Sequence, residues 1–119
     1  MKLEVGQFAR LKSGYICKII NINDFRDPNM KYGVEANYLK DIMFIGGDDV
    51  VKASYNIIDI LEKGDYVNGY PIYEIVEYEN NTRAIVIGDD SKSIIWKKQD
   101  IKSVITHEQM EQMAYKVGE

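Results

Sequence analysis

Few residues in this 119-residue chain have the type and spacing that chemistry requires. His107-Glu108 begins as the zinc-hydrolase motif HExxH does, but Glu111 stands where the second histidine should be, so the paired imidazoles are missing. The chain holds one Cys and one His, too few for the about four ligands of a structural Cys/His zinc site. Cys17 lies among apolar residues and is expected to be a buried structural thiol. The sequence therefore predicts neither zinc nor thiol catalysis.

Phosphate and carboxylate motifs are also incomplete. No GxxxxGK[ST] or GxGxxG loop is present, and Gly46-Gly47-Asp48-Asp49 lacks the lysine that would reach a phosphate. The pairs Asp48-Asp49 and Asp89-Asp90 are typical of turns, and neither has the spacing of an EF-hand. We therefore expect a protein that is not an enzyme and that needs no cofactor or metal.

The net charge of −4 bears on the kind of partner. Nucleic-acid binders normally present a basic face, because neutralising phosphates supplies most of their non-specific affinity. An acidic surface can instead dock on a basic protein face, or it can serve solubility alone. The acidic excess lies after Leu61. Sequence-independent DNA binding is therefore disfavoured, and a protein partner is favoured.

Two groups of residues are candidates for protein contact. The first lies in a polar loop with no regular element to bury it and comprises Phe25, Arg26 and Met30. The second is an acidic rim along one predicted hairpin and comprises Glu74, Glu77, Tyr78 and Glu79, with Asp89 and Asp90 in the next turn. Arginine and aromatic side chains are common interface anchors, and clustered acids speed the encounter with a basic partner.

A third group supports a different interpretation. Trp96 is followed directly by Lys97 and Lys98, and an aromatic ring beside lysines can stack a base while the ammonium groups meet phosphate. A lone tryptophan in a small β domain is also a common core residue. Nucleotide binding therefore stays open as the alternative to protein binding.

The elements that must position these residues are mostly strands. Alternation of apolar and polar residues, broken by glycine turns, predicts strands over 8–12, 15–22, 32–36, 41–45, 50–54, 66–67, 70–78, 83–87, 92–98 and 101–105. Residues 23–31 are predicted to be a surface loop, and 55–61 a short buried helix or 3₁₀ turn. Thr106 and Gln109 fit a capping box, which predicts a helix to about Met113. Residues 114–117 could return to a sheet edge.

An internal repeat organises these elements. Glu4-Val5-Gly6-Gln7-Phe8 aligns with Glu62-Lys63-Gly64-Asp65-Tyr66, and the turn Gly47-Asp48-Asp49 aligns with Gly88-Asp89-Asp90. After these turns, Asp49-Val50-Val51-Lys52-Ala53-Ser54 aligns with Asp100-Ile101-Lys102-Ser103. We therefore expect an all-β protein of two tandem small SH3-like β-barrels, 1–61 and 62–119, packed as one compact unit with a short C-terminal helix. The alternative is a single all-β domain in which glycine–aromatic hairpins recur by chance.

Several stretches carry a resemblance. They are Glu4–Gln7, Asn56–Ile60, Gly64–Gly69, Ile101–Gln109 and Tyr115–Glu119. Through them the chain resembles small phage and prophage proteins of Clostridia and related Firmicutes. The resemblance implies a mobile-element origin and carries no catalytic residues. Small accessory proteins of this kind often look like anti-defence factors, including inhibitors of CRISPR nucleases and sponges for defence nucleotides.

The sequence thus predicts a non-catalytic phage accessory protein in the host cytoplasm, with no membrane span or signal peptide. It would bind a host or phage protein, as an anti-defence inhibitor of a nucleic-acid-handling enzyme. Two alternatives stay open: a protein that sequesters a nucleotide or oligonucleotide, and a structural or assembly adaptor. Monomer and homodimer are both compatible with the sequence.

Overall fold

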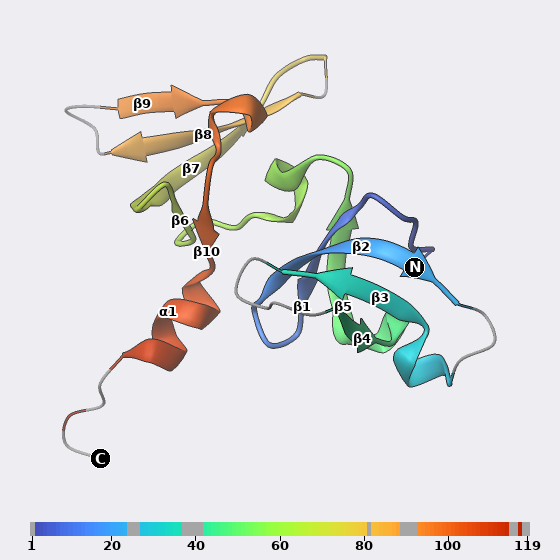
Figure 1. Ribbon diagram of the computed structural model, residues 1–119. Coiled ribbons are helices and arrows are strands. Elements are labelled where there is room, and N and C mark those ends of the chain that lie inside the picture. Colours follow the sequence, from blue (N-terminus) through green and yellow to red (C-terminus); the bar gives the residue numbers. More distant parts are fainter. Residues whose placement is uncertain are drawn as a thin grey trace. The chain divides into compact units, whose positions relative to one another are not determined.

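The computed structural model describes residues 2–23, 27–36, 42–80, 82–88, 93–114 and 117. Contacts divide the chain into two compact units: unit 1 is Met1–Lys12 with Ile16–Ile60, and unit 2 is Ser13–Tyr15 with Leu61–Glu119. Each unit is built on one five-stranded antiparallel sheet (Figure 1). The expected β-rich chain with one short helix is therefore confirmed. In the described ranges, no helix combines the length and the apolar character that crossing a membrane requires.

Unit 1 holds the first five strands and three 3₁₀ turns. The strands are β1 (Phe8–Leu11), β2 (Ile16–Ile22), β3 (Tyr32–Glu35), β4 (Met43–Ile45) and β5 (Val50–Ser54). The turns are η1 (Pro28–Met30), η2 (Gly47–Asp49) and η3 (Ile57–Ile60). The strand order is β4-β3-β2-β1-β5, so the last strand returns to pair with the first.

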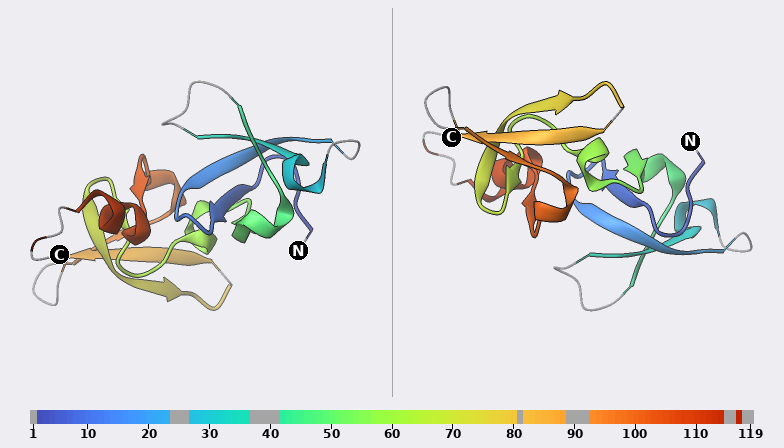
Figure 2. Two further views of the ribbon diagram at one scale, coloured as in Figure 1. Left: turned by 90° about the horizontal axis from the view of Figure 1, so that it is seen from below. Right: turned by 90° about the horizontal axis from the view of Figure 1, so that it is seen from above.

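Unit 2 has the same order of parts. Its strands are β6 (Tyr66–Val67), β7 (Tyr70–Glu77), β8 (Arg83–Gly88), β9 (Ser93–Trp96) and β10 (Val104–Ile105), followed by the helix α1 (His107–Met113). The turn η4 (Lys98–Asp100) precedes β10. The strand order is β10-β6-β7-β8-β9, and again the last strand pairs with the first. Figure 2 shows the strands of each unit from two further sides.

The repeat is visible in individual hydrogen bonds. The Gly6 amide donates to the Ile19 carbonyl at 2.8 Å, and the Gly64 amide donates to the Ile72 carbonyl at 3.2 Å. Both glycines have positive φ, 95° and 98°, a conformation that residues with a Cβ rarely adopt. Gly6 and Gly64, which the sequence aligns, therefore have the same backbone conformation and make equivalent hydrogen bonds in the two units.

The predicted alignment of Asp49 with Asp100 agrees with their hydrogen bonds. Asp49 Oδ2 accepts from the Gly46 amide at 3.0 Å and thereby closes η2 just before β5. Asp100 Oδ2 accepts in the same way from the Lys97 amide at 2.9 Å and closes η4 before β10. The structural counterpart of Gly47–Asp49 is therefore Lys98–Asp100. Asp89 and Asp90, which the sequence aligns with Asp48 and Asp49, lie outside the described residues.

Three predictions need correction. The predicted loop 23–31 contains η1, where Asp27 Oδ1 accepts from the Asn29 amide. The predicted strand 101–105 is shortened to β10, because the amides of Lys102 and Ser103 donate to the Asn68 side chain instead of to a strand. Of residues 114–117 only two are described, and neither lies in a strand. Barrel closure is not detected among the described strands.

Each unit has its own core. In unit 1 the fully buried side chains include Ala9, Ile19 and Val34 from neighbouring strands, and the thiol of Cys17 is buried, as expected. Unit 2 buries Val67 and three side chains of β8, Ala84, Ile85 and Ile87, together with two polar residues, Asp65 and Thr106. Buried polar groups need hydrogen-bond partners, and the partners of Asp65 lie in the site described below.

Candidate functional site

The strand β9 forms one edge of the sheet in unit 2. Among the described strands only β8 pairs with it, through Val86 opposite Ile95 and Ile87 opposite Ile94. Successive side chains of a strand point to opposite faces, yet Ile94 is 56% exposed and Ile95 is 54% exposed. An edge strand with unpaired backbone groups and apolar side chains on both faces is a template for a further strand.

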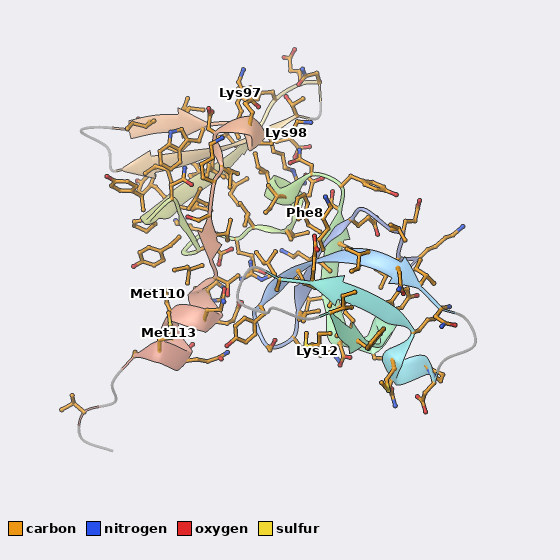
Figure 3. All side chains as sticks on the ribbon, viewed as in Figure 1. Phe8, Lys12, Lys97, Lys98, Met110 and Met113 are labelled. Carbon is orange, nitrogen blue, oxygen red and sulfur yellow. The ribbon has the colours of Figure 1, made fainter. Side chains whose placement is uncertain are left out.

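Basic residues follow this edge directly. Lys97 and Lys98 are both exposed, and Figure 3 shows them around the turn that leaves β9. The ring of Trp96 is half-buried and meets the ring of Tyr70 edge-on, with centroids 6.1 Å apart. The three residues of the predicted nucleotide group therefore lie together at the end of β9 because they are consecutive, and the indole already contacts a tyrosine.

The residues of the predicted acidic rim lie on one hairpin but not on one face. Glu74 is opposite Val86, whereas Glu77 is opposite Arg83, and the two glutamates are three positions apart, which places them on opposite faces of the strand. Glu77 Oε2 lies 3.9 Å from Arg83 Nη2. Tyr78 and Glu79 are exposed beyond the end of β7, and Asp89 and Asp90 lie outside the described residues. The acids therefore surround the hairpin and do not form one flat patch.

The predicted contact loop is only partly visible. Phe25 and Arg26 lie outside the described residues. Met30 is the last residue of η1 in unit 1 and is 45% exposed. The structure therefore supports the exposure of Met30 and leaves the other two anchors as predictions.

A cluster that the sequence did not predict lies in unit 2. His107 Nε2 is 3.0 Å from Glu62 Oε1 and 2.7 Å from Glu108 Oε1. One donor atom from each of the three residues lies within 4.8 Å of the other two. The side chains are 42% exposed for His107, 34% for Glu62 and 30% for Glu108, so water and small ions can reach the cluster.

Buried Asp65 holds the two segments of this cluster together. Its Oδ2 accepts from the Glu62 amide at 2.7 Å, and its Oδ1 accepts from the His107 amide at 2.9 Å. Between Glu62 and Asp65 the chain turns at Gly64, whose φ of 98° suits glycine. One fully buried carboxylate thus sets the distance between Glu62 and His107.

The sequence missed this cluster for a clear reason. The HExxH motif considers only residues near His107 in the chain, and Glu111 does not match it. Glu62, which contacts His107, lies 45 positions earlier. The aligned repeat did place Glu62 at the start of the second unit, but nothing in its spacing pointed to His107. The pairing of β10 with β6 and the hydrogen bonds of Asp65 bring the two segments together.

Comparison with known proteins gives no relative. No protein-family model matches the chain, and neither a curated protein nor a solved structure gives a significant match. The resemblance to phage and prophage proteins therefore stays a prediction.

Proposed function

We propose that this protein is a non-catalytic protein-binding module that takes up an extended segment of a partner protein along the outer edge of β9. The observation that carries the proposal is the exposure of Ile94 and Ile95 on opposite faces of an edge strand. A strand added there would pair with the free backbone groups of β9, and its side chains would cover one isoleucine on each face.

The charge next to this edge defines the partner segment. Lys97 and Lys98 are exposed at one end of β9, and Lys102 is exposed after the following turn. Complementary charge speeds encounter and sets the register of a docked segment. The partner segment therefore combines alternating apolar residues with carboxylates near the end that meets Lys97.

We also propose a fold type for each unit and a biological role for the complex. Each unit is SH3-like, a proposal supported by the shared strand order and by the equivalent hydrogen bonds of Gly6 and Gly64. The phage and prophage resemblance supports a partner among host or phage proteins, and anti-defence inhibition is the role we propose for the complex.

The test compares variants of matched edge strands. Ile95→Lys places a charge on the exposed edge in unit 2, and Val51→Lys does the same on β5, the terminal strand of the sheet in unit 1, where Val51 is also exposed. Wild-type and variant proteins are tagged and used to capture proteins from phage-infected and uninfected host lysate, with quantification by mass spectrometry. Thermal unfolding confirms that both variants fold.

We expect one protein to be captured stoichiometrically by the wild type and by Val51→Lys, and to be lost with Ile95→Lys. A synthetic peptide from that protein should then bind the wild type and not Ile95→Lys in a fluorescence-anisotropy titration. Equal capture by all three proteins would refute binding at β9.

The sequence-based alternatives have distinct signatures. Nucleotide sequestration through Trp96, Lys97 and Lys98 predicts quenching of the single tryptophan when nucleotides or oligonucleotides are added. An assembly adaptor predicts concentration-dependent self-association in light scattering. Under our proposal Trp96 fluorescence stays unchanged across nucleotides, and it changes when the partner segment binds.

A further inference from the structure

We propose that Glu62, His107 and Glu108 in unit 2 bind one divalent transition-metal ion, of the class of Mn²⁺, Fe²⁺, Co²⁺ or Ni²⁺. The inference does not depend on the β9 edge or on protein binding. No sequence motif and no related protein assigns a metal to these residues.

The distances between the donor atoms fit an octahedral ion. Adjacent ligands of an octahedral ion with bonds of about 2.0–2.1 Å are about 2.9 Å apart, whereas tetrahedral ligands at that bond length are about 3.4 Å apart. His107 Nε2 lies 3.0 Å from Glu62 Oε1 and 2.7 Å from Glu108 Oε1. Both distances from Nε2 to a carboxylate oxygen therefore match the spacing of adjacent ligands around an octahedral ion and are shorter than the tetrahedral spacing.

His107 Nε2 has at most one hydrogen for the two carboxylates beside it. An imidazole nitrogen carries at most one hydrogen, and that hydrogen points along one line. Two carboxylate oxygens from different residues approach the same Nε2 within 3.0 Å, so one N–H cannot be well aligned with both. A cation placed among the three atoms attracts both carboxylates and the imidazole lone pair together.

The charge and type of the donor groups also suit a divalent transition-metal ion. Two carboxylates and one neutral imidazole carry the charge that offsets a divalent cation. Imidazole suits transition metals, and carboxylates suit harder ions such as Mn²⁺, so the mixed set favours the octahedral transition metals over Ca²⁺ or a thiolate-type zinc site. The backbone that carries two of the donors is also held in place without the ion, because buried Asp65 accepts from the amides of both Glu62 and His107.

The test uses the fact that His107 is the only histidine. Protein freed of metal by chelation is titrated with Mn²⁺ alone while the imidazole signals are followed by ¹H–¹³C NMR, and affinities for Mn²⁺, Co²⁺, Ni²⁺ and Zn²⁺ are measured by calorimetry. We expect substoichiometric Mn²⁺ to broaden the His107 ring signals selectively, and calorimetry to give one site per chain.

Variants assign the site. Glu62→Gln and Glu108→Gln should each weaken Mn²⁺ binding at least about 10-fold, since losing even a residue that only supports a ligand commonly costs that much. Glu111→Gln removes the same charge from the same helix outside the cluster and should bind as the wild type does. The proposal is overturned if Mn²⁺ in large excess leaves the wild-type His107 signals unchanged, or if the double variant Glu62→Gln/Glu108→Gln binds as the wild type does.

Discussion

At the scale of single residues, burial controls the chemistry of Cys17. Desolvation raises the pKa of its thiol from 9.0 to about 11, because the apolar surroundings disfavour the thiolate. We expect the folded protein to react slowly with a disulfide reagent such as DTNB near neutral pH, and the protein unfolded in urea to release one thiol rapidly. Fast labelling of the folded protein would contradict the buried placement of this side chain.

The raised pKa of Cys17 makes the stability of the protein depend on pH. The folded state keeps the Cys17 proton up to a higher pH than the unfolded state does, so the unfolded state binds fewer protons between about pH 9 and pH 11. The contribution of this group to stability is complete below pH 9 and decreases as the pH rises toward 11. Cys17→Ala should therefore show a shallower fall of melting temperature than the wild type across this alkaline range.

At the scale of elements, Asn68 joins the turn between β6 and β7 to the segment before β10. Its φ of 53° is left-handed, its Oδ1 accepts from the amides of Lys102 and Ser103, and its Nδ2 donates to the Asp100 carbonyl. Asn68→Asp keeps both acceptor bonds, whereas Asn68→Gly keeps only the backbone conformation. We expect Asn68→Gly to lose about 1–2 kcal/mol more stability in urea unfolding than Asn68→Asp. Equal stability of the two variants would show that these bonds contribute little.

The N-cap of α1 gives a second prediction for an element. Thr106 is fully buried, its Oγ1 accepts from the Gln109 amide, and the Gln109 side chain accepts from the Thr106 amide. Thr106→Ala removes the cap and should lower the free energy of unfolding by about 0.5–2 kcal/mol. Thr82→Ala, in an exposed turn, is the control and should change stability little. Urea unfolding followed by circular dichroism measures both.

At the scale of the whole molecule, charge reversal separates two modes of partner binding. The triple variant Glu74→Lys, Glu77→Lys and Glu79→Lys adds positive charge around the β7–β8 hairpin. If a partner segment with carboxylates adds to β9, its affinity should stay equal or rise, because the variant attracts acidic segments. If the acidic rim contacts a basic partner, affinity should fall and its salt dependence should flatten. Biolayer interferometry at low and high salt distinguishes the two.

Local patterns in the sequence predicted most elements correctly. The glycine and Asn-Gly turns marked the hairpins β1–β2 and β6–β7, because positive φ is favourable for so few residues. The capping box at Thr106 predicted α1 to its last residue, Met113, because both of its hydrogen bonds join residues three positions apart. Each of these features depends on neighbours in the chain, and so the sequence displays it.

Features that depend on distant contacts were missed or misplaced. The strand 101–105 was predicted too long because the side chain of Asn68 takes two of its amides. Glu74 and Glu77 were grouped as one rim, and the register of β7 against β8 places them on opposite faces. The exposure of Ile94 and Ile95 depends on the position of β9 at the sheet edge and on what packs against each face, and neither is given by neighbouring residues.

The sequence by itself determined the two β-rich halves, their glycine turns, the capped helix and the burial of Cys17, because short-range backbone geometry and apolar patterning are written in neighbouring residues. Only the tertiary structure decided which edge stays open at β9 and which side chains meet at His107. Those outcomes depend on the pairing of β10 with β6 and on the Asp65 carboxylate, which join residues more than 35 positions apart. Contacts over such separations follow from strand order and register, which no local pattern specifies.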